Sequence, residues 1–291
     1  MPENANSVDL ISHQVFNVLN GVGNVYAAIL LGSCSRGEES YFVTEDGERQ
    51  LLSDYEMIVV TKENRIPQQA EAGLRELRYN LRSRSKSPFF DLEWNYYWKR
   101  KLPFMDKRFI NFEMKTAGKL ICGDPKVFDL LPGITVENLN FAELDSIVNH
   151  RLYHVLKGFW GIDEHQKKYL IARNTLDITS VVLPFEGKLI CSYEKRIEAL
   201  PEKLCKGVFG DNIIERLNDY LEMKKDSLSA AYEKYCVDEM LELFLRDMYA
   251  LYEYQKSNQM GKAFCQNKRL MLKGILIHFF PLMEASKIMS H

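Results

Sequence analysis

Apolar residues follow different patterns in the two halves of the chain. In the first half they form short runs bounded by turn residues, such as residues 25–31, a pattern typical of buried strands. Residues 7–19 instead carry apolar residues at helical spacing, and Ser7 or Asp9 is placed to cap a helix there. We expect a helix over residues 7–19 that packs on a first strand over residues 25–31.

Two further strands are predicted from apolar runs over residues 51–60 and 89–98, with a last strand over residues 119–122. A helix is expected over residues 67–81, since it begins near a proline, which suits a first helical turn. A short helix over residues 126–131 would end this half of the chain.

The second half has helical spacing throughout. Helices are expected over residues 141–159, 164–183 and 270–283, and residues 212–254 are long enough for two helices. We therefore predict an α+β fold, in which a mixed sheet with helices occupies residues 1–132 and an all-α bundle occupies residues 142–291.

Composition narrows the classes of function. The 291 residues carry a net charge of −2 and are 27% charged, which is ordinary for a globular protein and argues against a broad nucleic-acid surface. The six cysteines form no CxxC pair, so we expect reduced thiols and neither a zinc site nor a disulfide framework. The N-terminus does not resemble a signal peptide and no apolar run is long enough for a membrane helix, so a cytoplasmic protein without membrane contact is expected.

The end of the first apolar run carries residues suited to phosphate binding. Gly32 lets a phosphate approach the backbone without a Cβ in the way, and Ser33 supplies a hydroxyl. The residues that follow can open a helix whose free N–H groups face an anion, and Arg36 adds a positive charge nearby. These three residues are our candidates for phosphate binding.

Two carboxylates lie in the next apolar run. On a strand, Asp54 and Glu56 would point to the same face, roughly 7 Å apart. Carboxylates in an apolar setting are costly unless they are neutralised. Mg²⁺ accepts one or two carboxylates together with substrate phosphates, and two such ions suit phosphoryl or nucleotidyl transfer. The sequence therefore predicts a magnesium site here, and a surface strand with two solvated acids is the alternative.

The segments GSCSRGE (residues 32–38) and SDYE (residues 53–56) together resemble the signature of the nucleotidyltransferase superfamily related to DNA polymerase beta. Within that superfamily they resemble small bacterial transferases of the aminoglycoside adenylyltransferase and minimal nucleotidyltransferase kind. The resemblance implies a nucleotidyltransferase fold in the first domain. It also implies that the Gly-Ser pair holds the phosphates of an NTP such as ATP, and that the two acids bind two Mg²⁺ ions.

The resemblance requires a third carboxylate on a neighbouring strand, which would complete the metal site or take the proton of an attacking hydroxyl. Asp91 and Glu93 both alternate with apolar residues in the strand predicted over residues 89–98. The Trp-Asn-Tyr-Tyr after Glu93 is similar to the segment that follows the third acid in related transferases, so Glu93 is the first candidate and Asp91 the second. Glu113 is a weaker candidate and is expected on a helix surface.

The spacing departs from the family pattern. Twenty residues separate Ser33 from Asp54, which is longer than usual. The excess, over residues 41–50, contains the turn signal Asp46-Gly47. We expect a hairpin inserted at the rim of the site, with the site itself retained.

The resemblance implies an enzyme that moves a nucleoside monophosphate from an NTP to a hydroxyl of an aminoglycoside- or sugar-like small molecule and releases pyrophosphate. The acceptor would lie in the cleft between the domains, where Arg173, Asn174 and Asp177 are candidates to face it. The acidic residues within residues 212–254 are either a solvated face or a wall for a cationic acceptor. Two alternatives stay open: a transferase that modifies a protein or tRNA, and a non-catalytic or antitoxin-like binding module with the same fold.

Overall fold

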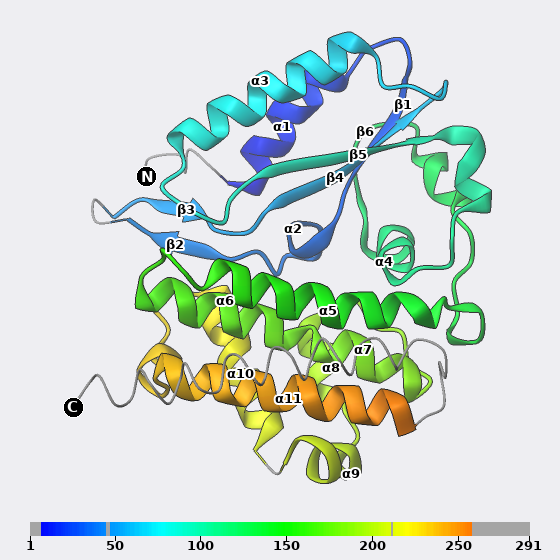
Figure 1. Cartoon of the computed structure of the whole chain (residues 1–291). Coiled ribbons are helices and arrows are strands. Elements are labelled where there is room, and N and C mark those ends of the chain that lie inside the picture. The colour runs from blue at the N-terminus through cyan, green and yellow to red at the C-terminus, as the bar shows by residue number, and fades with distance from the viewer. Residues whose placement is uncertain (1–6, 45–46, 211, 258–291) are drawn as a thin grey trace.

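Residues 7–131 form a sheet with helices packed on it, and residues 141–257 form a group of helices next to that sheet (Figure 1). The structure is a computed structural model that describes residues 7–44, 47–210 and 212–257. Its α+β architecture agrees with the prediction from the sequence. The helix predicted over residues 270–283 lies outside the described residues.

The sheet has four strands in the order β5-β4-β1-β6. β1 (Val25–Leu30) is antiparallel to both β4 (Tyr55–Thr61) and β6 (Lys119–Gly123), whereas β5 (Leu92–Trp98) is parallel to β4. The two central strands, β1 and β4, are almost wholly buried. Their continuous apolar sequences follow from this position, because both faces of the sheet are covered there.

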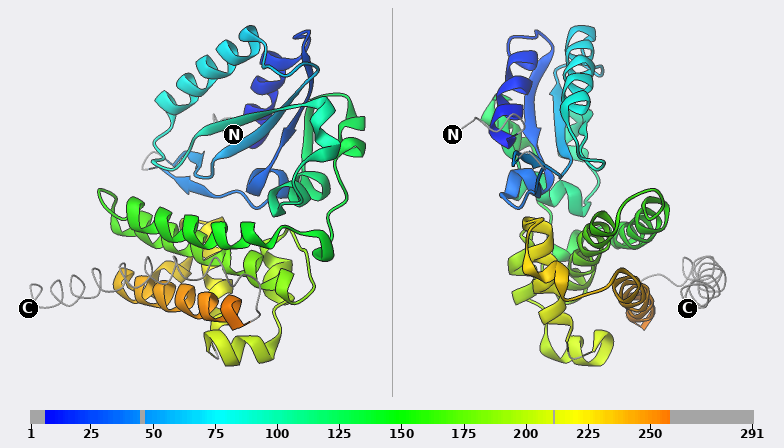
Figure 2. Two further views of the ribbon diagram at one scale, coloured as in Figure 1. Left: turned by 45° about the vertical axis from the view of Figure 1, so that its right-hand side comes forward. Right: turned by 90° about the vertical axis from the view of Figure 1, so that its left-hand side faces the viewer.

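Helices α1 (Val8–Leu19) and α3 (Gln68–Arg84) pack on one face of the sheet and share one apolar cluster with it. Ser7 caps α1 by accepting a hydrogen bond from the Leu10 N–H, as predicted. The other face carries α4 (Phe109–Ala117) and the short 3₁₀ helices η1 (Lys99–Phe104) and η2 (Pro125–Leu130). This second face also looks towards the helical half of the chain (Figures 1 and 2).

A hairpin precedes β4. β2 (Tyr41–Val43) and β3 (Arg49–Leu51) pair antiparallel, which confirms the expected hairpin. The strand predicted over residues 51–60 begins only at Tyr55, so that part of the prediction is wrong. Residues 52–54 do not continue the strand, because the Ser53 hydroxyl accepts a hydrogen bond from the Ser40 N–H across the base of the hairpin.

The helical half consists mainly of seven α-helices within residues 141–210 and 212–257: α5 (Phe141–Gly158), α6 (Glu164–Leu176), α7 (Ile178–Phe185), α8 (Tyr193–Glu198), α9 (Glu202–Leu204), α10 (Ile213–Lys225) and α11 (Val237–Ser257). The two helices expected over residues 212–254 are confirmed. α6 packs against α5, α10 and α11, so it is the central helix of this half. Among the described residues, none of the helices combines the length and the apolar character that a membrane crossing requires.

The single helix predicted over residues 164–183 is wrong, because the chain changes direction at Asp177 between α6 and α7. The hydroxyls of Thr179 and Ser180 donate to the carbonyls of Leu176 and Asp177, respectively. Such side-chain bonds compete with the helical backbone ladder and favour a break. α7 then continues to Phe185 and includes the proline that was expected to follow the helix.

Gly123 at the end of β6 generates a prediction about stability. Its φ is +94°, and a Cβ there would lie 2.2 Å from the Tyr26 carbonyl oxygen and 2.6 Å from the Ala27 Cα. Because these obstacles are backbone atoms, we expect Gly123→Ala to lower the free energy of unfolding by about 3 kcal/mol in urea denaturation. Gly133→Ala is the control, since nothing lies within 4 Å of a Cβ there. Equal stability of the two variants would contradict the prediction.

Candidate functional site

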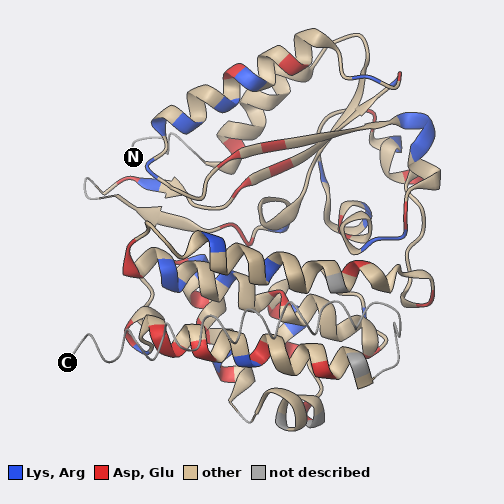
Figure 3. Ribbon diagram, in the orientation of Figure 1, with Lys and Arg blue, Asp and Glu red and all other residues tan. Residues whose placement is uncertain are grey.

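A cavity of about 200 Å³, which we call the central cavity, lies between the sheet and the helical half. On the sheet side it is lined by the junction of β1 with α2 (Gly32–Arg36), by the start of β4 and by α4. On the helical side, four different helices each contribute one basic side chain: Arg151, Arg173, Arg196 and Lys224. Acidic positions on β4 and β5 lie above basic positions on these helices in Figure 3.

The β1–α2 junction brings the backbone close to a carboxylate. Gly32 has a φ of +66°, and a Cβ there would lie 2.6 Å from Oε2 of Glu56. The adjacent Leu31 N–H donates to the Glu56 carbonyl at 2.9 Å, which fixes this approach. Ser33 follows at the edge of the cavity. The predicted phosphate-binding pair and the predicted metal ligand Glu56 are therefore neighbours.

Two glutamates on adjacent strands lack partners. Glu56 and Glu93 are opposite each other in the parallel β4–β5 pairing, so both leave the sheet on the same face. Within the described residues, neither has a hydrogen bond or an ion pair. Burial raises the pKa of Glu56, and burial together with the nearby Asp54 raises that of Glu93. Neither carboxylate is thus directly paired, and the nearby Arg173 only partly offsets the rise in their pKa values.

Asp54, the remaining predicted metal ligand, is paired. It lies just before β4 and accepts a hydrogen bond from Nη2 of Arg173 at 3.0 Å. In the part of the chain that the structure describes, no three His, Cys, Asp or Glu side chains gather closely enough to hold a metal ion as they stand. The chemistry of Asp54, Glu56 and Glu93 suits Mg²⁺, because all three offer carboxylate oxygens. Within the described residues, Glu56 and Glu93 are not paired.

Asp91 differs from Glu93 in its surroundings. It lies just before β5, not within a strand as predicted. Arg78 of α3 donates to both of its carboxylate oxygens, one of them at 2.7 Å, and Arg82 approaches to 3.5 Å. These guanidinium groups neutralise Asp91 from the α3 side. Of the two predicted candidates, Glu93 is thus the unpaired one within the described residues; it is exposed and lies outside the lining of the central cavity.

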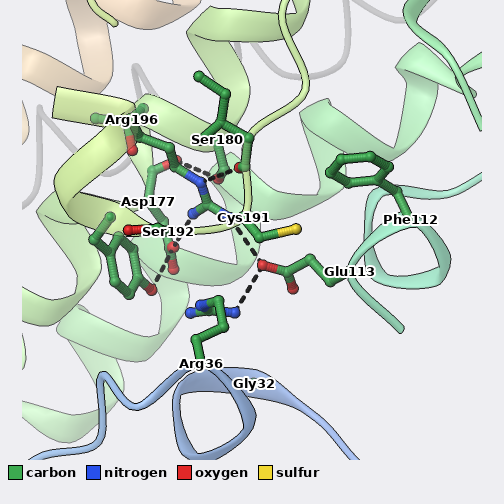
Figure 4. Close-up of polar contacts among 12 residues, drawn as sticks. Gly32, Arg36, Phe112, Glu113, Asp177, Ser180, Cys191, Ser192 and Arg196 are labelled. Atoms are coloured by element: carbon green, nitrogen blue, oxygen red, sulfur yellow. Dashed lines mark hydrogen bonds and ion pairs between the residues drawn. The ribbon is translucent and has the colours of Figure 1, made fainter. Parts of the chain in front are cut away.

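Arg36 lines the cavity, but its charge is already balanced. Its guanidinium lies 2.7 Å from Glu38 and 2.8 Å from Glu113, and its side chain is only 7% exposed. Glu113 also accepts a hydrogen bond from Arg196 at 2.8 Å, so it lies between two arginines (Figure 4). The expectation that Glu113 lies on a helix surface is wrong, because helical spacing does not reveal that α2 and α8 cover this side of α4.

Asp177 joins three helices of the cavity wall. It pairs with Arg151 at 2.5 Å, and it accepts a hydrogen bond from the Tyr193 hydroxyl at 2.9 Å. Burial raises the pKa of Asp177, but Arg151 and Arg196 outweigh this and lower it overall. The carboxylate therefore stays ionised inside the protein, where it holds α5, α7 and α8 together.

Two of the three residues expected to face the cleft line the cavity, namely Arg173 and Asp177. The third, Asn174, does not: it is buried and its amide donates to the Leu170 carbonyl within α6. Successive residues on a helix point in directions about 100° apart, so neighbours in sequence are not expected to share a site.

Lys224 is the most deeply buried basic residue of the cavity apart from Arg196. Its Nζ donates to the Glu38 carbonyl and to the Ser40 hydroxyl, and within the described residues it has no carboxylate partner. Burial, with the nearby Arg173 and Arg36, lowers its pKa to about 7. An anion in the cavity would therefore be stabilised by Lys224 and would favour its charged form.

Arg151, Arg196 and Lys224 were not predicted as site residues. Single basic residues on amphipathic helices usually face solvent, so the helical spacing of the first two did not indicate that they line a cavity. Lys224 did give one, because it follows Leu217 and Leu221 at helical spacing and thus occupies the apolar stripe of α10.

No protein-family model matches the chain, and no curated protein matches it at a significant level.

The buried Lys224 generates a prediction about pH. Between pH 7 and 9 the folded protein loses the Lys224 proton, while an unfolded lysine keeps it until about pH 10.4. The unfolded state then binds more protons, so stability must rise with pH relative to Lys224→Met, by about 2 kcal/mol over this range. Urea denaturation at several pH values measures the difference. Lys225→Met should retain the rise, and parallel curves for wild type and Lys224→Met would contradict the prediction.

Proposed function

We propose that the chain is an Mg²⁺-dependent nucleotidyltransferase with a nucleotidyltransferase-type catalytic domain. The observation that carries the proposal is the pair of unpartnered carboxylates, Glu56 and Glu93, beside Asp54 and the Gly32 backbone. Asp54 and Glu56 face a wall of basic side chains across the central cavity, and Glu93 is exposed next to Glu56 on β5. The resemblance of residues 32–38 and 53–56 to the superfamily signature supports the same function.

The charges around the central cavity suit a metal-bound triphosphate. The lining contains five basic and five acidic side chains, so it is balanced without a ligand. Two divalent cations and one fully ionised NTP together carry no net charge, so their joint binding preserves this balance. Binding of a triphosphate alone, or of metal ions alone, would leave the cavity with a net charge.

Different residues would bind the metal ions and the phosphates. Asp54, Glu56 and Glu93 would hold Mg²⁺, which supplies electrostatic stabilisation of the charge that develops on the transferred phosphoryl group. Gly32 and Ser33 would bind phosphate oxygens. Arg173 can then exchange its present partner, Asp54, for a phosphate, and Lys224 gains an anionic partner that it now lacks.

The proposed reaction is a substitution at the α-phosphorus of the NTP. The acceptor hydroxyl oxygen forms the new O–P bond, the bond to the β-phosphate breaks, and pyrophosphate leaves. Glu93 is the residue that we assign to take the hydroxyl proton, because it is the exposed, unpaired carboxylate next to Glu56.

The central cavity must widen to bind both substrates. Its volume of about 200 Å³ is below the roughly 300 Å³ at which ligand sites begin. The Asp54–Arg173 pair crosses the cavity from the sheet to α6, so breaking it is a necessary step in opening the site.

Turnover tests the proposal. With Mg²⁺ and each of the four NTPs, pyrophosphate release should require a hydroxyl acceptor from an aminoglycoside and sugar panel. Asp54→Asn should lower the rate by about 100-fold or more, since it removes a charged metal ligand. Asp238→Asn, on the exposed side of α11, is the control. If wild type neither releases pyrophosphate nor binds Mg²⁺–NTP, the catalytic proposal fails and a binding module remains.

The third carboxylate can be assigned by kinetics. Glu93→Gln should lower kcat by about 10²–10⁴-fold, the usual contribution of a general base, and flatten the acidic limb of the pH–rate profile. Asp91→Asn should leave kcat within a few-fold and instead lower stability, because Arg78 loses its partner. The opposite result would assign the role to Asp91.

A further inference from the structure

A second cavity, of about 510 Å³, lies beside the central one, and we call it the outer cavity. It is enclosed by the β2–β3 hairpin, by the loop that leads into β5, by the start of α6 and by the segment after α10. Nothing in the proposed nucleotide chemistry uses these residues. Its volume is within the range of small-molecule sites.

The outer cavity adjoins the central cavity along α6 and just after α10. Tyr169 lines the outer cavity and Arg173 the central one, one turn apart on α6. Ser227 of the outer cavity follows Lys224 of the central one by three residues, just past the end of α10. One helical turn is about 5.4 Å, so a single small molecule can extend from one cavity into the other.

The outer cavity lies on the side of the third carboxylate. Phe89, which lines it, precedes Glu93 by four residues, a span of at most about 14 Å. Leu52, also in the lining, precedes Asp54 by two residues. Glu93 lines neither cavity, so a ligand that extends from the outer cavity past Phe89 is needed to bring a hydroxyl to it, on the side of β4 opposite β1 and Gly32.

The lining offers flat rings together with hydrogen-bonding groups. The His165 ring stacks on Tyr232 with centroids 3.9 Å apart and an angle of 13°, and Phe89 packs against Tyr169 at 5.3 Å. Nε2 of His165 lies 2.7 Å from the Ser227 carbonyl, which can only accept, so Nε2 carries the proton and Nδ1 is left as an acceptor.

The lining also carries polar groups. The hydroxyl of Tyr169 is buried with the hydroxyls of Ser40 and Ser53 near it. Gln166, whose side chain accepts from the Asp163 N–H, adds an amide to the same wall. Rings beside polar groups match a ligand that has both an apolar ring face and hydroxyls on its rim.

The outer cavity is far less charged than the central one. Three charged side chains line it, Lys86, Asp163 and Glu233, against ten in the central cavity. Asp163 is already engaged as the cap of α6, where it accepts from the Gln166 N–H at 2.8 Å. The acidic residues of α11, Asp238, Glu239 and Glu242, are exposed and line neither cavity, so they form no wall for a cationic acceptor.

We propose that the outer cavity binds the ring of the acceptor, and that the acceptor is an uncharged, hydroxyl-bearing ring compound of the glycoside class. This inference rests on the proposed transferase function, since it assigns the acceptor of that reaction. The ring stacks on the aromatic lining, and one hydroxyl reaches past Glu93 to the α-phosphorus in the central cavity. A polycationic aminoglycoside does not match this lining.

Ligand-observed saturation-transfer NMR without nucleotide tests the proposal. The probes are p-nitrophenyl β-D-glucopyranoside, kanamycin and ATP. We expect wild type to bind the glycoside with a Kd of about 1 mM. His165→Ala and Phe89→Ala should each weaken this binding about fivefold, the value of one aromatic contact. Kanamycin should bind more weakly than the glycoside.

Matched controls lie outside both cavities. His150→Ala removes an exposed histidine from α5, and Phe104→Ala removes a phenylalanine that is 85% exposed. Neither should alter glycoside binding. His165 is itself exposed, so its variant does not depend on the folding of a core substitution.

Three results would overturn the proposal: no glycoside binding by wild type, equal losses in the test and control variants, or weaker ATP binding with unchanged glycoside binding. The last result would make the outer cavity a nucleobase site. Asp54→Asn should bind the glycoside as wild type does. Glycoside binding without any turnover would therefore reject the proposed function alone, and turnover that is unaffected by His165→Ala and Phe89→Ala would reject this inference alone.

Discussion

Charged side chains that are buried between the sheet and the helical half need partners, and this requirement sets how the two halves meet. Moving an ion out of water costs several kcal/mol, which an opposite charge in good geometry offsets. Asp54 therefore pairs with Arg173 of α6, and Glu113 pairs with both Arg36 and Arg196. Because these contacts join the sheet half to the helical half, a change in how the halves dock would leave several charges uncompensated at once.

The exceptions to this pairing support the proposed site. Glu56 and Glu93 carry raised pKa values and Lys224 a lowered one, in each case chiefly because burial disfavours the charged form. Glu56 lies across the central cavity from the basic wall that includes the lysine, and Glu93 is its exposed neighbour on β5. A cation would compensate the acids and an anion the lysine. A metal–nucleotide complex brings both, whereas neither a simple cation nor a simple anion relieves all three groups.

The sequence predicted those features that depend on local pattern. The continuous apolar runs of β1 and β4, the Ser7 cap and the β2–β3 hairpin follow from residues that are near one another in the chain. The alternation of Asp54 and Glu56 with apolar residues was visible in the same way. The pairing of Asp177 was not, since its partners Arg151 and Tyr193 lie in other helices. Glu113 was misjudged for the same reason: its partners Arg36 and Arg196 are distant in sequence.

Charged side chains line the central cavity, whereas few charged side chains line the outer one. The inserted hairpin makes this difference possible. Residues 41–51 form a hairpin that is inserted between Ser33 and Asp54, and the Ser40–Ser53 hydrogen bond closes the base of this insertion. The contact between Gly32 and the Glu56 carboxylate is therefore undisturbed, while Phe42 on the hairpin reaches the outer cavity. An insertion at this position can change which ring compound is accommodated without altering the arrangement of the carboxylates. In the proposed transferase, selectivity for the acceptor would thus be separable from the electrostatics of phosphate transfer, because the two would depend on different contacts.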